Sequence, residues 1–415
     1  MRRILFVSRK FPRDVEKSSD GTFLRMRLFL DALTELADTV DILFYVDPGS
    51  DVSLAASRRT EDGFRSIWGI PSRVTLCPLG TPRRASSFWS HYLEPATRFF
   101  QPSFHTEASG VAQVAALETA LENKPDAVFV HRLDSMGPLL LRGRPLPPVF
   151  LDIDDIEHVK FFREIRQPPF WLGKYLYYLQ GPALCLWERR AVKFSRKAFV
   201  CSDLDRRYLE RWWRLPQVAT IPNAVAIPED WGIDPSSRAL LFLASYFYSP
   251  NVVGAEFLIQ KIWPSVRAAC PDAQLIIAGK DPERIPSFAS RPAGVEFTGF
   301  VDDLASLYRR VRIACSPILS GGGTRLKILE AAAHGKAIVS TRIGAEGLDM
   351  QDGQDILLRN SGREFAAACV ELLNDPRRCQ ALGAAARETV SRSWDRRHIV
   401  RRIKDEIRAP SVAPH

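Results

Sequence analysis

Short apolar runs alternate with amphipathic segments along most of the chain. The runs are typical of buried parallel strands, and several segments between them carry apolar residues at helical spacing. This alternation predicts an α/β protein built on parallel sheets, and it excludes all-α and all-β folds. The expected strands are residues 3–7, 40–46, 127–130, 149–153, 198–202, 239–244, 275–279, 295–301, 311–317 and 337–341, and the expected helices include 23–36, 111–121, 203–211, 304–310, 365–373 and 377–391.

The N-terminal half opens as a Rossmann-like strand–helix–strand unit. No GxGxxG pattern lies between residues 3 and 46, so a dinucleotide site is unsupported. His131 follows the strand at 127–130, and ligands of open parallel sheets bind beyond the carboxyl ends of strands. This histidine is therefore a candidate site residue, although one histidine at a strand end is more often structural. The segment 71–110 shows no period and predicts an irregular loop.

Acidic residues follow the expected strand at 149–153. The run LDIDDIEH offers four carboxylates and a histidine, a set that could hold Mg²⁺ or Mn²⁺ through oxygen ligands. We expect no metal, because acids at a strand end also cap the next helix and counter nearby arginines. Asp154 and Asp155 are instead expected to shape a binding cleft.

The C-terminal half contains the most informative stretch, residues 311–344, which predicts strand, glycine loop, helix, turn and strand. With Thr324 as the expected N-cap, the N–H groups and positive helix end would suit phosphate oxygens. Arg325 and Lys327 add cationic donors. Glu330 lies roughly 9 Å further along the helix at about 1.5 Å per residue, where a carboxylate could accept bonds from ribose hydroxyls. A flexible loop and a solvated glutamate are the plain alternatives; together, these features favour a nucleotide site.

The run SPILSGGGTRLKILEAAAHGKAIVST resembles the donor-site signature of family 4 (group 1) glycosyltransferases, and a subgroup with GxGTRxKxLEA is similar to it. Many members carry two glutamates in this motif. This chain keeps Glu330 and has Gly322 at the other position, so the motif does not identify the donor sugar.

The resemblance implies a GT-B fold, in which two Rossmann-like domains have parallel sheets facing a central cleft. The expected domains are residues 1–225 on the acceptor side and 226–392 for the nucleotide-sugar donor. Residues 393–415 would form a helix crossing back to the first domain and a disordered tail.

The resemblance also implies roles for single residues. His131 would contact the donor sugar, and Arg325 and Lys327 would stabilise the leaving diphosphate. Glu330 would position the ribose. Relatives often place basic residues near Ser245 that this chain lacks, so Arg325 and Lys327 would carry more of that task. The other expected donor-binding residues are Gly321, Gly322, Gly323, Thr324, Ser245, Gly299, Phe300 and Val301, and the expected cleft or acceptor residues are Gly21, Asp154, Asp155 and Asn223.

Composition indicates the number of domains, the cellular compartment and the class of partner. A chain of 415 residues suggests two or three domains at about 150 residues each. Seven scattered cysteines without a CxxC pair indicate a reducing, cytoplasmic compartment and no structural zinc. The N-terminal residues are not typical of a secretory signal, and no run approaches the ~18 apolar residues of a membrane span. The net charge of +9 suits phosphorylated or lipid partners, and no nucleic-acid-binding signature is present.

Residues 159–195 combine many aromatic and basic side chains. Such a segment could rest on a membrane surface near a lipid-linked acceptor, or it could be a core helix covered by basic side chains. We expect peripheral contact with the inner face of the membrane.

The sequence and the resemblance together predict a retaining glycosyltransferase without a cofactor. It would move a sugar from a nucleotide-diphosphate sugar to a hydroxyl of a glycan, lipid-linked or small-molecule acceptor. Two alternatives stay open: a GT-B sugar-nucleotide epimerase or phosphorylase, and a non-catalytic nucleotide-sugar-binding protein.

Overall fold

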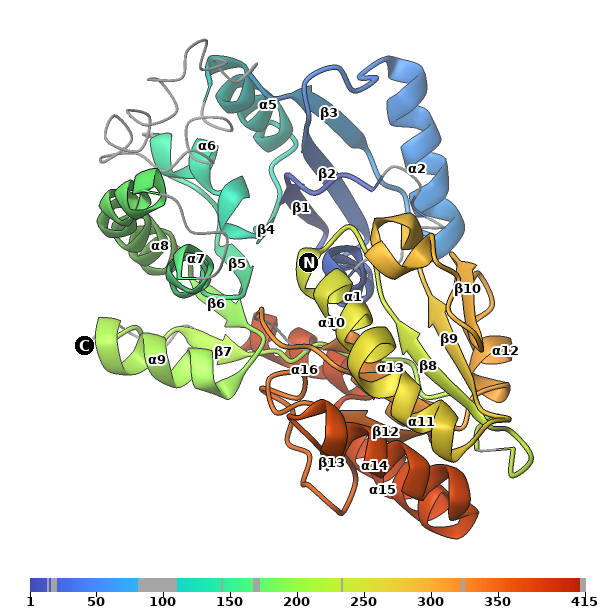
Figure 1. Cartoon of the computed structure of the whole chain (residues 1–415). Coiled ribbons are helices and arrows are strands. Elements are labelled where there is room, and N and C mark those ends of the chain that lie inside the picture. Colours follow the sequence, from blue (N-terminus) through green and yellow to red (C-terminus); the bar gives the residue numbers. More distant parts are fainter. Residues whose placement is uncertain are drawn as a thin grey trace. The chain divides into compact units, whose positions relative to one another are not determined.

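The chain forms two compact units in the computed structural model (Figure 1). The first unit comprises residues 1–222 and 400–415, and the second comprises residues 223–399. Every named strand pairing in both units is parallel, so the predicted α/β class is confirmed. The structure describes residues 1–12, 15, 21–80, 110–142, 145–166, 172–232, 234–321 and 325–410.

The first unit is built on a 7-stranded sheet in the order β3-β2-β1-β4-β5-β6-β7. The order reverses between β1 and β4, whose paired residues run from Ile4 with Ala127 to Ser8 with His131. In open parallel sheets, ligands bind beyond the carboxyl ends at such a reversal. The elements are β1 Arg3–Ser8, α1 Gly21–Leu36, β2 Thr39–Val46, α2 Leu54–Trp68, β3 Val74–Pro78, α5 Val111–Leu121, β4 Ala127–His131, α6 Gly137–Leu141, β5 Val149–Asp154, α7 Glu157–Ile165, the 3₁₀ helix η2 Leu172–Gln180, α8 Gly181–Phe194, β6 Lys197–Val200, α9 Asp203–Trp213 and β7 Val218–Thr220.

The second unit has a 6-stranded sheet in the order β10-β9-β8-β11-β12-β13. Its order reverses between β8 and β11, which pair at Leu240 with Ile313 and Leu241 with Ala314. The site described below lies at this reversal. The elements are β8 Ala239–Leu243, α10 Ser249–Phe257, a π-helical turn Leu258–Ile262, α11 Trp263–Ala269, β9 Gln274–Ala278, β10 Val295–Gly299, α12 Leu304–Arg309, β11 Ile313–Ser316, α13 Leu326–Ala333, β12 Ala337–Ser340, β13 Leu357–Leu358, α14 Gly362–Asn374 and α15 Pro376–Ser393.

Local sequence explains how these elements begin and pack. β4 and β5 are buried along their whole length, as expected for continuous apolar runs in a parallel sheet. α14 begins with a capping box in which Ser361 and Glu364 bond each other's backbone N–H groups. Gly279 directly follows β9 at φ +128°, and a Cβ there would collide with the carbonyl oxygen of Ala244. The carboxyl ends of β8 and β9 can therefore approach only with glycine at this position.

Two segments differ from the expectations. β3 lies within residues 71–110, which we predicted to be irregular; residues 81–109 of that stretch lie outside the described residues. The run PEDWGIDP, residues 228–235, has the composition of an interdomain linker, but it belongs to the second unit. Lys336 donates to the carbonyl of Gly232, and Arg387 donates to that of Pro228.

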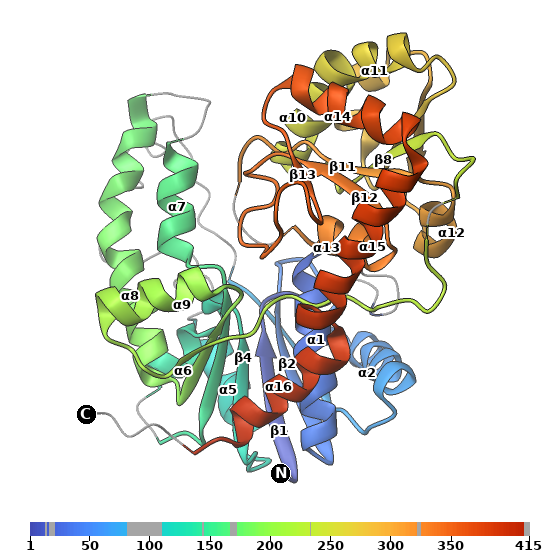
Figure 2. The same cartoon turned by 90° about the horizontal axis from the view of Figure 1, so that it is seen from below.

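The C-terminal helix α16, Arg396–Arg408, returns the chain to the first unit from Val400 onward (Figure 2). Lys404 forms an ion pair with Glu35 of α1, and Lys197 of β6 forms another with Glu406. The expected disordered tail, residues 411–415, lies outside the described residues.

Candidate functional site

The loop between β11 and α13 lies at the carboxyl edge of the second sheet. Gly321 takes φ +103°, a backbone conformation that favours glycine. An added Cβ would stand 2.7 Å from the hydroxyl oxygen of Tyr248, so that side chain would have to shift. α13 begins at Leu326, preceded by the buried Arg325. Arg325 occupies the N-cap position, so the prediction of Thr324 as N-cap was wrong. Gly322, Gly323 and Thr324 themselves lie outside the described residues.

Lys327 points from α13 toward β8 and the loop that follows it. Its Nζ donates to Asn251 Oδ1 at 2.8 Å and lies 4.6 Å from the ring centroid of Phe242. The pKa of Lys327 is lowered to about 7, mainly by burial and then by the positive Arg325, with Glu330 opposing both. The ammonium is thus held at the strand-order reversal and exchanges its proton near neutral pH.

Glu330 is half-buried on α13. The alternative that it is only a solvated surface residue is therefore not supported. Burial raises its pKa to about 7, against the opposing effect of Lys327. The buried Tyr308 lies close enough for Glu330 to help raise the pKa of its phenol, after the larger effect of burial. A carboxyl group in this setting can accept or donate hydrogen bonds at neutral pH.

The other predicted donor-side residues lie at the ends of neighbouring strands in this sheet. The carbonyl of Ser245, just after β8, accepts a hydrogen bond from Asn251 Nδ2 at 2.8 Å. Gly299 ends β10 with φ +67° and accepts from the N–H of Gly279. Phe300 is exposed, with Lys280 Nζ 4.6 Å from its ring centroid, and Val301 packs on the core. The structure therefore gathers these residues at one edge of the second sheet.

In the first unit, His131 ends β4 with its ring fully buried. Its Nδ1 lies 3.0 Å from Ser8 Oγ at the reversal between β1 and β4, and within the described residues Nε2 has no hydrogen-bond partner. Burial lowers the pKa of His131 well below its usual range, helped by the charges of Arg132, Arg25 and Lys10. The imidazole is therefore neutral at physiological pH.

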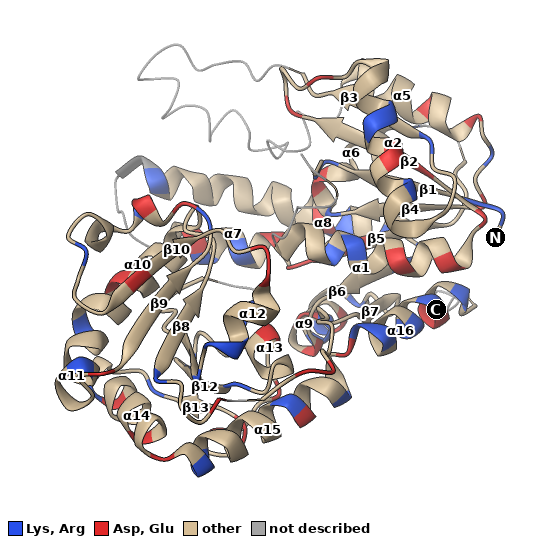
Figure 3. Cartoon of the chain, turned by 90° about the vertical axis from the view of Figure 1, so that its right-hand side faces the viewer, with Lys and Arg blue, Asp and Glu red and all other residues tan. Residues whose placement is uncertain are grey.

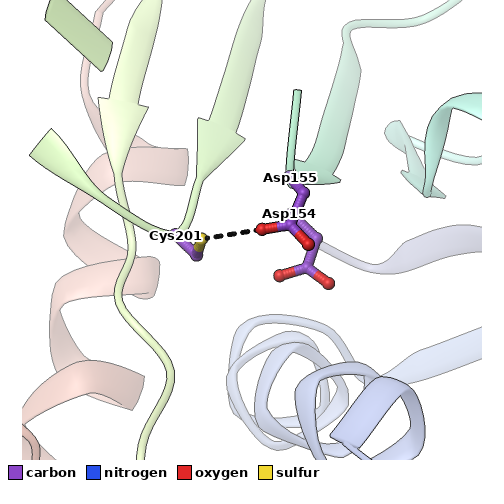
Figure 4. A group of neighbouring side chains, drawn as sticks. All are labelled: Asp154, Asp155 and Cys201. Carbon is purple, nitrogen blue, oxygen red and sulfur yellow. Dashed lines mark hydrogen bonds between the residues drawn. The ribbon is translucent and has the colours of Figure 1, made fainter. Parts of the chain in front are cut away.

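Asp154 and Asp155 end β5 and begin the loop before α7 (Figure 4). Asp154 has φ +66° and accepts from Arg132; Arg25 also lies 3.2 Å from its Oδ1. Asp155 Oδ1 lies 3.4 Å from Cys201 Sγ. Burial raises the pKa of Asp155 to about 6, and the charge of Asp154 adds to this.

Asp154, Asp155 and Cys201 are close enough together to hold a metal ion. The chemistry of the surroundings does not favour one, because Arg25 and Arg132 already compensate the charge of Asp154. The prediction of no metal therefore stays in place as a prediction.

Two further residues complete the predicted set. Gly21 is the exposed first residue of α1, and Asn223 is buried at the first position of the second unit. The sequence reasoning missed Asn251, Tyr248 and Arg25. Two of them had a signal in the sequence. Asn251 directly follows Ser-Pro at the start of a helix, and Arg25 is an arginine among the apolar residues of α1.

The comparisons with known proteins agree with this picture. Residues 237–375 match the family model for Glycosyl transferases group 1. An uncharacterized 44.6 kDa protein in the cps region of Klebsiella pneumoniae is 23% identical over 223 residues, which are 51% of this chain and 56% of that protein. A phosphatidyl-myo-inositol mannosyltransferase of Mycolicibacterium smegmatis is 29% identical over 207 residues, 46% of this chain and 52% of that protein. The chain thus matches only about half the length of these curated relatives.

Solved structures match over nearly the whole chain. Sucrose-phosphate synthase from Thermosynechococcus elongatus has a TM-score of 0.69 at 16% identity, covering 98% of both chains. HepE from Anabaena in complex with UDP and glucose has a TM-score of 0.64 at 15% identity, covering 98% of this chain and 99% of the other. The predicted GT-B fold, two Rossmann-like units with parallel sheets, is confirmed. The predicted resemblance to group 1 glycosyltransferases is confirmed as well, by the match of residues 237–375 to that family's model.

Proposed function

We propose that this protein is a retaining glycosyltransferase that moves a sugar from a nucleotide-diphosphate sugar to an acceptor hydroxyl. The observation that carries the proposal is the placement of Lys327, Arg325 and Glu330 on and before α13, at the strand-order reversal of the second sheet. The family domain over residues 237–375 and the UDP complex of the structurally similar HepE support the choice of donor class. Retention at the anomeric carbon follows from the resemblance alone.

In this mechanism, an acceptor hydroxyl replaces the nucleotide at the anomeric carbon, and the departing diphosphate gains negative charge. Lys327 and Arg325 stabilise that charge from fixed positions, which lowers the barrier more than mobile groups in water would. Glu330 holds the ribose. In the first unit, His131 is the proposed sugar-contacting residue, as the resemblance implies; its ring is buried, and Nε2 has no hydrogen-bond partner among the described residues.

The test is equilibrium binding of a panel of nucleoside diphosphates to the wild type, Arg325→Ala and Lys327→Ala. Each substitution should weaken the tightest nucleotide about tenfold or more, the loss of one charge-assisted contact. Arg310→Ala is the matched control, since Arg310 is exposed in the same unit and pairs with Glu296. Unchanged affinity for every nucleotide in both site variants would rule out the donor-site assignment.

A product assay separates the remaining alternatives. Donor-dependent transfer with a product of unchanged anomeric configuration supports the retaining transferase. Conversion of the donor sugar without any acceptor would favour the epimerase or phosphorylase, and tight binding with no turnover across acceptors would favour the binding protein.

We also propose a peripheral membrane contact that brings a lipid-linked acceptor within reach. On η2 and α8, Leu176, Leu179 and Leu186 are exposed, and Arg189 and Lys193 are exposed further along α8. The one acid of α8, Glu188, is buried, so the outer face combines apolar and basic side chains, as membrane-surface helices do. Figure 3 colours the charged residues of the chain. None of the described helices is long and apolar enough to cross a bilayer.

Flotation with vesicles tests this contact. The wild type should float with anionic vesicles at low salt and not with zwitterionic ones, and Leu179→Asp/Leu186→Asp should lose most of that binding. Val253→Asp is the matched control, because Val253 is equally an exposed apolar residue, on α10. No binding of the wild type to anionic vesicles would overturn the proposal.

A further inference from the structure

The loop between β8 and α10 provides no cation of its own. Its residues 244–248 read ASYFY, without lysine or arginine. The ammonium beside this loop comes instead from Lys327 on α13, whose Nζ meets Asn251 Oδ1 at 2.8 Å and faces the ring of Phe242 on β8. The positive charge beside the loop after β8 is therefore provided by α13, an element far away in the sequence.

The orientation of the Asn251 amide is set by its other contact. Nδ2 donates to the carbonyl oxygen of Ser245 at 2.8 Å, and a carbonyl can only accept hydrogen bonds, so the NH₂ end must face Ser245. Oδ1 is then the atom that faces Lys327, and it can only accept. Asn251 itself is fixed in the first turn of α10, where its backbone N–H donates to the carbonyl of Tyr248 at 2.9 Å.

The same loop also touches the glycine loop. The Tyr248 hydroxyl lies against Gly321, where an added Cβ would stand 2.7 Å from the oxygen and 3.3 Å from an Arg325 nitrogen. Tyr248 thus lies against Gly321, and Asn251 contacts Lys327. The residues after β8 therefore help to place Lys327.

We propose that Asn251 is a positioning residue that holds the Lys327 ammonium at the diphosphate seat. This inference rests on the proposed function. Asn251 accepts a hydrogen bond from Nζ. Because an ammonium carries three N–H donors, Lys327 can make this bond and still donate to phosphate oxygens. The amide dipole favours the charged amine at a site where burial disfavours it, and it fixes a side chain that would otherwise sample many rotamers.

The first test is a double-mutant cycle on nucleoside-diphosphate binding with Asn251→Ala, Lys327→Ala and the double variant. Asn251→Ala should weaken binding about tenfold in the wild type, the loss of one hydrogen bond to a charged group. It should have almost no effect in the Lys327→Ala background. An equal loss in both backgrounds would overturn the proposal, because Asn251 would then act without Lys327. Asn360→Ala is the matched amide control; Asn360 accepts from the backbone N–H of Arg342 in the same unit.

The second test needs no ligand and so separates this inference from the proposed function. Acylation of Lys327 by a small amine-reactive ester is followed by mass spectrometry against pH in the wild type and in Asn251→Ala. The midpoint of reactivity should move to lower pH in the variant, because the charged amine loses its acceptor. Superimposable profiles would overturn the positioning role even if nucleotides bind. Failure of the wild type to bind any nucleotide, with a shifted profile, would defeat only the proposed function.

Discussion

Arg25 of α1 and Asp152 of β5 form an ion pair inside the first unit, with Nη2 and Oδ1 2.6 Å apart and side chains only 1% and 0% exposed. Arg25 Nε also donates to Asp152, and Nη1 donates to the carbonyl oxygen of Ile221 at 3.0 Å. One guanidinium therefore ties a helix, a central strand and the last residues before the unit boundary. Breaking it would leave a carboxylate in an apolar core.

Arg25→Met should lower the free energy of unfolding by about 3–5 kcal/mol, because Asp152 would stay buried without its partner. Urea denaturation measures this directly. The double variant Arg25→Met/Asp152→Leu should recover most of the loss, since the unpaired carboxylate is then gone and Asp154 keeps its ion pair with Arg132. Arg59→Met is the control, because its pair with Asp51 is exposed and should contribute little to stability. A loss below about 1 kcal/mol for Arg25→Met would contradict this account.

Nucleotide binding should depend on the protonation of Lys327. Its pKa is lowered to about 7, so the amine is mostly neutral above that pH, and an anionic diphosphate favours the charged form. Affinity should therefore fall as pH rises through about 7 to 8.5, by at most tenfold per pH unit for one proton. Calorimetry in buffers of different ionisation enthalpy should register proton uptake on binding.

Lys327→Arg is the informative comparison, because a guanidinium stays charged over this range. Its profile should be flat where that of the wild type falls. Glu330, whose pKa is also about 7, titrates in the same window, so the series is repeated with Glu330→Gln. A fall that survives Lys327→Arg but vanishes in Glu330→Gln would assign the dependence to the carboxyl group.

The fold was predictable where burial makes the apolar pattern continuous. β4 is buried at every position from Ala127 to His131. Its apolar run AVFV therefore predicts a strand inside the sheet. β3 is only partly buried between prolines, and β13 has just two residues. Neither is long or uniform enough to stand out, and both are set by pairing with a neighbouring strand.

The site was predictable only as far as its residues are neighbours in sequence. Arg325, Lys327 and Glu330 share one helical turn or two, so spacing alone groups them. Asn251 lies 76 residues before Lys327, and Arg25 lies 127 residues before Asp152. Those pairs come from strand order, which an isolated sequence pattern does not specify. The shifted pKa values likewise come from burial that only the folded chain creates.

Gly279→Ala should destabilise the second unit strongly. The residue takes φ +128°, and a Cβ would collide with the backbone of Ala244, which cannot move without disturbing β8. We expect a loss of more than about 3 kcal/mol, against about 1 kcal/mol for Gly353→Ala, where φ is +82° but the space is open. Thermal unfolding of the two variants compares them. Equal changes in melting temperature for both variants would show that the contact between Gly279 and the backbone of Ala244 does not limit the side chain at position 279.

Asp155→Asn should stabilise the protein at neutral pH and not at acidic pH. Burial and the charge of Asp154 raise the pKa of Asp155 to about 6, above its value in the unfolded chain. The stability that the protonated carboxyl contributes is complete below about pH 4 and is lost as pH rises through about 6. The amide keeps an acceptor for the Cys201 thiol without the charge. The variant should gain about 1–2 kcal/mol over the wild type at pH 7.5, and this gain should vanish near pH 4.

Melting temperatures of Asp155→Asn and the wild type across this range measure the difference. The exposed Asp302 provides the control, and Asp302→Asn should show no such divergence with pH. A gain that is the same at both ends of the range would come from packing alone and would contradict a buried, proton-linked carboxyl group. A loss at pH 7.5 would mean that the ionised form is stabilised by donors that outweigh burial.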